Sequence, residues 1–213
     1  MFQEQYKQKG FYWGLKPNPV LEKFINIIPK GKALDIGAGE GRNSIFLAQN
    51  DFDVEALDKI PEGLEKCKNL AKETGLHINT IVQDVKNFDF QKEKYFLILA
   101  VASLDFLKKT EVEVIFNKIK KSLVDNGFIF LSVFSTNDPL FYKLKERGFK
   151  EIEENTFFMP KIDTIRHFFT KKEIAEAFNS FEVVYTEEKD IEDRSHDQPH
   201  FHSIIEFLAR KMR

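Results

Sequence analysis

The chain has 213 residues, 31% of them charged, and a net charge of −2 at pH 7. This near-neutral balance excludes the strongly basic footprint of a nucleic-acid-binding protein, while the length suits a single domain with a substantial core. The longest apolar run, Tyr95 to Leu104, is too short to cross a bilayer, so no contact with a membrane is expected.

Strand-like and helix-like segments alternate through the first two-thirds of the chain, as expected for a parallel sheet built from βαβ units. Asn18 and Pro19 indicate the start of a first helix, and Thr110 with Glu113 forms a capping box for a later one. The predicted strands are residues 32–36, 53–57, 78–82, 95–101 and 128–134, and the helices between them include residues 41–49 and 61–74.

The pattern changes after the fifth strand. Residues 149–168 form an irregular aromatic stretch, interpreted as an insertion over the active site, and Thr170 with Glu173 starts another helix. Two further strands, residues 181–187 and 201–209, flank a polar loop and are expected to pair as an antiparallel hairpin. The predicted fold class is therefore α/β and Rossmann-like, with a seven-stranded, mostly parallel sheet that ends in a C-terminal antiparallel hairpin.

The most informative motif is a turn at the end of the first strand, where Gly37, Gly39 and Gly41 alternate with other residues. Glycines let the backbone approach a ligand closely, and Asp35 places a carboxylate at the edge where α/β sheets bind ligands. Arg42 stands where a dinucleotide-binding turn has its third glycine. The motif therefore favours a cofactor without a pyrophosphate, such as S-adenosylmethionine; the alternative is a turn that only starts a helix.

Two further carboxylates follow the next two strands. Asp58 ends the second strand at the distance from the glycine turn that suits a ribose diol. Asp84 ends the third strand, where a carboxylate can accept a hydrogen bond from the adenine amino group. Acidic side chains at the ends of successive strands predict an adenosine site more specifically than the glycine turn alone.

Cys67 is the only cysteine, so no disulfide can form within the chain. Together with amino-terminal residues that lack the apolar core of a signal peptide, this favours a reducing, cytoplasmic location. The apolar residues at helical spacing around Cys67 predict that it packs in the core and is not a nucleophile.

The stretch Leu34–Ala48 resembles the glycine-turn region of the tellurite-resistance-type S-adenosylmethionine-dependent methyltransferases, which are relatives of the thiopurine methyltransferases. The Gly-Arg-Asn-Ser sequence within it is more specific to this family than the glycine turn that methyltransferases share in general. Residues 54–59, 82–85 and 97–107 also resemble this family, and the resemblance covers residues 11–211. It implies a class I methyltransferase fold with S-adenosylmethionine as the cofactor.

One methyltransferase domain over residues 1–213 is therefore expected. Its parts are an N-terminal lid and helix (1–30), a cofactor-binding core (31–135), an acceptor-side insertion (136–169) and a C-terminal helix and hairpin (170–213). The motifs and the resemblance together predict these cofactor-binding residues: Trp13, Asp35, Gly37, Ala38, Gly39, Arg42, Asn43, Asp58, Lys59, Asp84, Val85 and Val101.

Cationic or titratable residues near the predicted acceptor side are expected to bind and orient the methyl acceptor: Arg166, His167, His200 and His202. The histidines at 196, 200 and 202 also suggest a metal site, with Asp197 as a further ligand. Since no third ligand has the spacing of a metal motif, the sequence favours a polar pocket wall and predicts no metal.

The predicted function is methyl transfer from S-adenosylmethionine to a small soft or anionic acceptor, of the thiol or metalloid oxyanion type. Asp105 stands where relatives often carry histidine, which leaves the acceptor chemistry open. The alternatives are a non-catalytic S-adenosylmethionine-binding regulatory module and a protein or carboxylate methyltransferase. The sequence does not indicate an oligomeric state.

Overall fold

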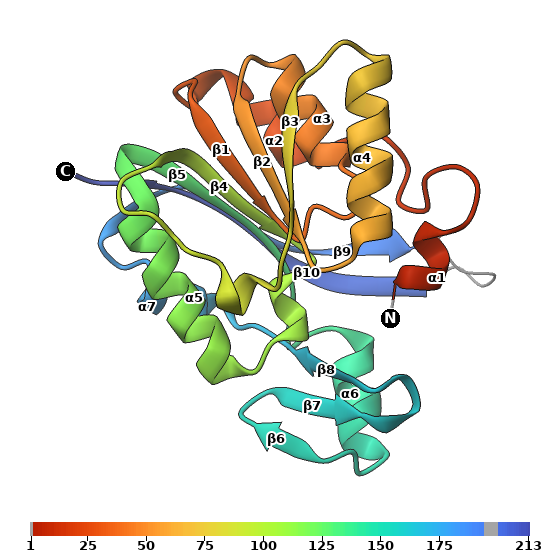
Figure 1. Ribbon diagram of the computed structural model, residues 1–213. Helices are drawn as coiled ribbons and strands as arrows, with labels where there is room; N and C mark the ends of the chain where they lie inside the picture. Colours follow the sequence, from red (N-terminus) through yellow and green to blue (C-terminus); the bar gives the residue numbers. More distant parts are fainter. Residues whose placement is uncertain (1, 194–199) are drawn as a thin grey trace.

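A seven-stranded sheet forms the centre of the computed structural model, which describes residues 2–193 and 200–213. The strand order is β3-β2-β1-β4-β5-β10-β9, with β1 to β5 parallel and β10 antiparallel to both of its neighbours (Figure 1). The predicted fold class is thus confirmed. The strands are β1 (Lys32–Ile36), β2 (Asp53–Asp58), β3 (Ile78–Val82), β4 (Tyr95–Val101), β5 (Leu123–Phe134), β9 (Phe181–Asp193) and β10 (His200–Lys211).

Helices cover both faces of the sheet (Figure 1). Leu97 and Leu99 of β4 pack on the face covered by α2, α3 and α4, whereas Ile98 and Ala100 pack on the face covered by α5 and α7. Burial on both faces explains why β4 reads as a continuous apolar run. The helices are α1 (Gln3–Tyr6), α2 (Pro19–Phe24), α3 (Arg42–Gln49), α4 (Pro61–Glu73), α5 (Lys109–Ser122), α6 (Pro139–Glu146) and α7 (Lys171–Ala177), with short 3₁₀ turns η1 (Ile25–Ile27), η2 (Val85–Asn87), η3 (Leu104–Phe106) and η4 (Pro160–Ile162).

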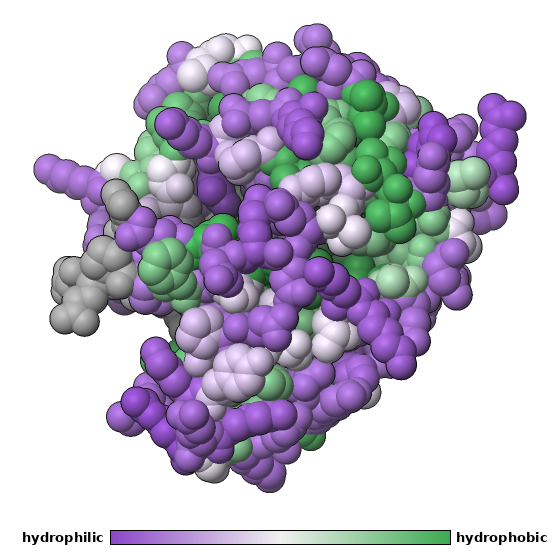
Figure 2. All heavy atoms as spheres, turned by 180° about the vertical axis from the view of Figure 1, so that it is seen from behind, coloured by the Kyte–Doolittle hydropathy of each residue, from purple (hydrophilic) through white to green (hydrophobic). Residues whose placement is uncertain are grey.

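The face of the molecule opposite to that of Figure 1 is largely hydrophilic, with apolar side chains gathered in one area of the main body (Figure 2). Among the described residues, none of the helices combines the length and the apolar character that a bilayer crossing requires.

Residues 149–168 are more regular than the sequence suggested. They form a separate antiparallel sheet of β6 (Glu151–Glu153), β7 (Thr156–Met159) and β8 (Thr164–His167), which lies beside α6 (Figure 1). Asn155 and Asp163 adopt positive φ angles of 55° and 43° at its two turns, a conformation that asparagine and aspartate tolerate better than most residues. The strands are too short for their alternation to be visible in the sequence.

The helix after β4 also begins earlier than predicted. Lys108 is its N-cap residue, and the Glu111 side chain accepts a hydrogen bond from the Lys108 backbone N–H at 2.9 Å. Thr110, the predicted cap, instead donates its backbone N–H to Glu153 of β6 at 2.9 Å. The second predicted cap is confirmed, since the Thr170 hydroxyl accepts the Glu173 N–H at 3.0 Å.

The C-terminal hairpin is longer than predicted. Its strand β9 continues to Asp193, which pairs with His200 of β10, so residues 189–193 belong to the strand and not to the loop. Near the base of the hairpin the register shifts by one residue, where Tyr185 pairs with Leu208 but Val183 pairs with Ala209. Most of β9 is exposed at the edge of the sheet, which explains why its sequence has no apolar alternation.

Candidate functional site

The glycine turn lies at the carboxyl end of β1 and leads into α3. Gly37, Gly39 and Gly41 all have positive φ angles, of 72°, 55° and 88°. A Cβ atom at Gly37 would lie 2.3 Å from Ser103, and one at Gly41 would lie 2.3 Å from the sulfur of Cys67. Both the backbone conformation and the close packing therefore require glycine.

Asp35 and Asp58 hold the turn from two sides. Asp35 is almost fully buried, and its carboxylate accepts the Ser44 hydroxyl at 2.7 Å. Asp58 accepts backbone N–H groups from Gly39 and Ile60, each at 2.9 Å. Burial raises the pKa of Asp35 to about 6 and also raises the pKa of Asp58. Asp58 lines the adjoining cavity, whereas Asp35 does not.

A narrow cavity extends from the glycine turn across the carboxyl ends of β2 and β3. Apolar side chains, including Ile36 and Leu107, line part of it, as expected for a slot that receives a flat aromatic ring. The predicted cofactor residues that line it are Gly37, Asp58, Lys59, Asp84 and Val85.

A larger cleft of ≈ 710 Å³ begins at the same turn and extends toward β5 and the C-terminal hairpin. Arg42 is half-buried in its wall, and it forms no ion pair with any residue that the structure describes. The predicted cofactor residues in this wall are Trp13, Gly37, Ala38, Gly39, Arg42, Asn43 and Val101, and the predicted acceptor residues are Arg166 and His202.

Arg166 is a buried cation that faces the larger cleft. Its side chain lies between two phenyl rings, with the guanidinium carbon 4.4 Å from the ring centre of Phe106 and 4.5 Å from that of Phe134. The Nε atom is buried and has no hydrogen-bond partner among the described residues. Burial lowers the pKa of Arg166, and the charges of Asp105 and Asp138 oppose that effect. Such a cation is suited to an anionic ligand.

Asp105 supports the Arg166 site from within the protein. It is fully buried, and one of its oxygens accepts the Phe134 backbone N–H at 2.6 Å. Burial raises the pKa of Asp105, while the nearby Arg166 charge lowers it. Asp105 thus balances the charge of Arg166 and fixes the end of β5.

His167 does not line either cavity, and its predicted role in acceptor binding is wrong. The side chain is fully buried, with Nδ1 2.8 Å from the Thr156 hydroxyl and Nε2 3.0 Å from Glu173. The ring also packs against Phe169, with 4.4 Å between ring centres. His167 therefore connects β7, β8 and α7 as a structural residue.

The two histidines of β10 lie beside the cleft at the start of the strand, away from the base of the hairpin. His202 lines the cleft, and its Nε2 is 3.0 Å from Nε2 of His200. His196 and Asp197, which the sequence suggested as further members of this cluster, lie outside the described residues. Asp193, which the sequence did not indicate, completes the cluster instead.

Comparison with known proteins decides the family. The model of the family "Tellurite resistance protein TehB" matches residues 3–160. The chain belongs to the TehB family. The family predicted from the glycine-turn region is thus confirmed.

Curated proteins with similar sequences are also named as methyltransferases. The probable S-adenosylmethionine-dependent methyltransferase TehB of Haemophilus influenzae is 27% identical over 139 residues, which cover 62% of this chain and 48% of that protein. A ubiquinone biosynthesis O-methyltransferase of Rickettsia conorii is 28% identical over 114 residues, or 54% of this chain and 38% of that protein. The chain thus spans about half the length, or less, of these curated relatives.

Solved structures share the fold of this TehB-family chain. A methyltransferase from Methanosarcina mazei has a TM-score of 0.76 and 22% identity, and the match covers 93% of this chain and 99% of that one. The TehB structure from Haemophilus influenzae has a TM-score of 0.72 and 20% identity, with 99% of this chain and 65% of that one covered.

The sequence missed a polar network that holds the TehB-family cleft together. Asn18, recognised only as a helix cap, donates its backbone N–H to Asn43 and its side-chain amide to Glu206, both at 2.9 Å. Glu206 in turn lies 2.6 Å from the ammonium of Lys189. Because these residues are far apart in the chain, no sequence spacing could reveal their contact. Asn43 therefore orders α2 as well as lining the cleft.

The burial of Asp35 predicts a pH-dependent stability. Because the fold raises the pKa of this carboxyl from 3.8 to about 6, it favours the protonated form, and ionisation destabilises the fold as pH rises through that range. Asp35→Asn removes this ionisation. Without ligand, we expect the variant to exceed the wild type by up to about 3 kcal/mol in free energy of unfolding near about pH 8. The difference in free energy of unfolding between variant and wild type, measured by urea titration, should vanish below about pH 4. An equal difference at about pH 4 and about pH 8 would contradict the raised pKa of Asp35.

Trp13 provides a spectroscopic test of the N-terminal lid. It is the only tryptophan, is 37% exposed and lines the cleft, with its ring packed edge-on against Phe2 and Tyr12. Its backbone N–H donates to Glu40 at 3.3 Å, which holds the segment over the glycine turn. If residues 1–17 close over the cofactor, saturation with S-adenosylmethionine should shift the tryptophan emission. Unchanged fluorescence at saturation would leave Trp13 as an anchor of the terminus only.

Proposed function

We propose that the chain transfers a methyl group from S-adenosylmethionine to a small soft or anionic acceptor, such as a thiolate or a metalloid oxyanion. Membership of the TehB family supports the enzyme class, and its relative in Haemophilus influenzae is named as a probable S-adenosylmethionine-dependent methyltransferase. A methyltransferase from Burkholderia thailandensis that contains S-adenosylhomocysteine shares the fold, with a TM-score of 0.65 and 18% identity. The preference for an anion rests on one observation, the buried guanidinium of Arg166 in the cleft wall.

The residues around the glycine turn fit the cofactor. The glycines of the turn have no Cβ atoms, so the cofactor can approach the backbone closely. The cavity next to the turn combines apolar walls with the carboxylates of Asp58 and Asp84. Asp58 would accept hydrogen bonds from the ribose hydroxyls, and Asp84 would accept one from the adenine amino group. Arg42, which has no ion pair among the described residues, would bind the cofactor's carboxylate. When bound, S-adenosylmethionine supplies an activated methyl group on its sulfonium.

The chain's own contribution to the reaction is mainly positioning. Methyl transfer is an in-line displacement, so the acceptor atom must approach along one direction in a site from which water is excluded. Arg166 would hold the acceptor's negative charge from the cleft wall, while Phe106 and Phe134 exclude water around the guanidinium. Good orientation of this kind can contribute a hundredfold or more to the rate, on the order of 3 kcal/mol or above.

An acceptor panel with methyl-labelled S-adenosylmethionine tests the proposal. We expect mass-labelled product from thiols or metalloid oxyanions, and little from neutral amines of similar size. Labelling of added proteins would instead favour a protein or carboxylate methyltransferase. Tight cofactor binding without any turnover across the panel would favour a non-catalytic regulatory module.

A further inference from the structure

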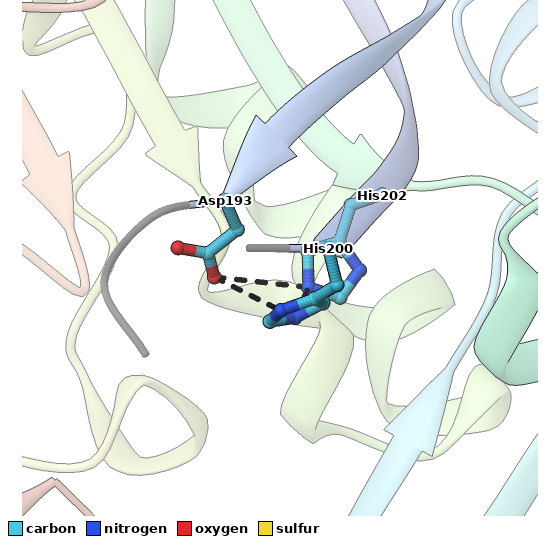
Figure 3. Close-up of side chains that lie close together, drawn as sticks. All are labelled: Asp193, His200 and His202. Carbon is cyan, nitrogen blue, oxygen red and sulfur yellow. Dashed lines mark hydrogen bonds and ion pairs between the residues drawn. The ribbon is translucent and has the colours of Figure 1, made fainter. Parts of the chain in front are cut away.

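Asp193, His200 and His202 meet where β9 ends and β10 begins, at the end of the C-terminal hairpin away from its base and next to the acceptor side of the cleft (Figure 3). Asp193 is the last residue of β9, and the histidines are the first and third residues of β10, on one face of the strand. Cross-strand pairing of Asp193 with His200 places the carboxylate directly beside the imidazoles. The arrangement therefore follows from the register of the two strands.

The distances within this triad are those of ligands around a single ion. The two histidine Nε2 atoms are 3.0 Å apart. Oδ2 of Asp193 lies 3.9 Å from Nε2 of His200 and 3.8 Å from Nε2 of His202. The point equidistant from these three atoms lies about 2.1 Å from each of them. Zinc-to-nitrogen and zinc-to-carboxylate bonds have this length, about 2.0–2.2 Å.

A fourth residue orients one of the ligands. Asp138 is fully buried, and its Oδ2 lies 2.8 Å from Nδ1 of His202 and accepts the Ser203 backbone N–H at 3.1 Å. A carboxylate can only accept, so Nδ1 carries the proton and Nε2 presents its lone pair to the triad. Hydrogen bonding of a ligand histidine to a buried carboxylate is the usual outer support of metal sites in proteins.

We propose that Asp193, His200 and His202 bind one divalent transition-metal ion such as Zn²⁺, with Asp138 as the residue that positions His202. Two imidazoles and a carboxylate suit Zn²⁺ and its first-row neighbours, whereas Mg²⁺ and Ca²⁺ prefer all-oxygen ligands. Three protein ligands leave a coordination position open, as in zinc sites that bind a substrate or water. The proposal departs from the sequence-based expectation of no metal site, and Asp193 is the third ligand that the sequence spacing did not indicate.

The location suggests what the open position binds, and this part rests on the proposed function. His202 and Arg166 both contact the side chain of Phe134. The centre of the His202 ring is 4.8 Å from that of the Phe134 ring, and the Arg166 guanidinium stacks on the same phenyl ring. Asp193, His202 and Arg166 all line the larger cleft. A thiolate or oxyanion acceptor would replace a water molecule on the ion and remain deprotonated, while Arg166 neutralises a further negative charge. No electron transfer is needed.

Direct metal binding tests the site without any assay of methyl transfer. The 213-residue chain, without a histidine tag, is freed of metal with a chelator and titrated with Zn²⁺ by calorimetry. We expect one Zn²⁺ per chain and no saturable binding of Mg²⁺. Co²⁺ should give the visible absorption of a low-coordinate site with nitrogen and oxygen ligands. Absence of stoichiometric binding by either transition metal would overturn the proposal.

Variants locate the ion. His202→Ala and Asp193→Asn should each weaken Zn²⁺ binding by on the order of a hundredfold or more, and Asp138→Asn by about 10- to 100-fold. His77→Ala, which changes an exposed histidine before β3, is the matched control and should bind Zn²⁺ like the wild type. Equal affinity in wild type, His202→Ala and Asp193→Asn would refute the site.

S-adenosylmethionine affinity separates the two proposals. It should remain unchanged in the triad variants, which also shows that they are folded. Zn²⁺ binding that depends on the triad, together with no turnover of any acceptor, would support the metal site and count against the proposed function. Turnover of anionic acceptors by metal-free protein, at the rate of the Zn²⁺-loaded protein, would refute the ion's role in acceptor binding.

Discussion

Arg166→Ala is expected to lower kcat/KM for an anionic acceptor by about a hundredfold or more and to leave S-adenosylmethionine affinity nearly unchanged. The guanidinium is buried between Phe106 and Phe134 in the cleft wall, and a water molecule that entered the space left by alanine would carry no positive charge. Arg166→Lys keeps the charge but loses the planar group that fits between the rings, and we expect it to recover activity only in part. Steady-state kinetics and cofactor titrations on the same samples measure both effects.

Arg147, an exposed arginine at the end of α6, is the matched control. Its alanine variant should retain wild-type kinetics. His202→Ala should resemble Arg166→Ala, because both side chains face the same cleft. Wild-type turnover in both cleft variants would exclude these residues from acceptor binding, and a parallel loss of cofactor affinity would place Arg166 on the cofactor side instead.

Asp58→Ala is expected to weaken S-adenosylmethionine binding by about 2–4 kcal/mol, or about 30- to 1,000-fold. For a wild-type affinity in the micromolar range, near about −8 kcal/mol, the Kd of the variant would lie between about 40 μM and about 1 mM in a calorimetric titration. The carboxylate faces the adenosine cavity and also accepts the Gly39 N–H, so its loss removes ribose contacts and loosens the turn.

Asp58→Asn separates these two effects in part, because its single amide oxygen can still accept the Gly39 N–H while the charge and the bond from Ile60 are lost. Asp53→Ala is the matched control, since Asp53 is an exposed aspartate at the opposite end of the same strand. Control and wild type should bind the cofactor equally. Binding by Asp58→Ala at wild-type strength would remove the ribose assignment.

The fold and the cofactor side could be predicted from the sequence because their signals are local. The sequence of β4 is apolar at successive positions, which predicts a strand buried on both faces. Gly37 and Asp58 follow the first and second strands of one βαβ unit, so their spacing in the sequence is set by the length of that unit. The structure places both residues on the same cavity. Each strand of the parallel sheet contributes its carboxyl end to the same edge, so chain order alone brings these groups together.

The acceptor side was harder to predict because it is assembled from segments that are distant in the chain. Arg166 and His167 are neighbours in sequence, but β8 is a strand, so their side chains point to opposite faces and only Arg166 reaches the cleft. Recognising that required the small sheet of β6, β7 and β8, whose strands are too short to show a pattern. Asp193 was missed for a related reason, since it reads as part of a polar loop until its pairing with β10 is known.

The one-residue register shift at the base of the hairpin gives β9 one position where a residue can be lost without disturbing the triad. Pairing with β10 fixes the face of each residue of β9, and Val184 is the extra residue between the paired Val183 and Tyr185. Loss of Val184 would remove the bulge and leave Asp193 opposite His200, whereas loss of a residue between Tyr185 and Asp193 would shift Asp193 by one position and turn it away from the histidines. In family members of altered hairpin length, we therefore expect the aspartate and the histidines to be kept together where the length changes at this bulge.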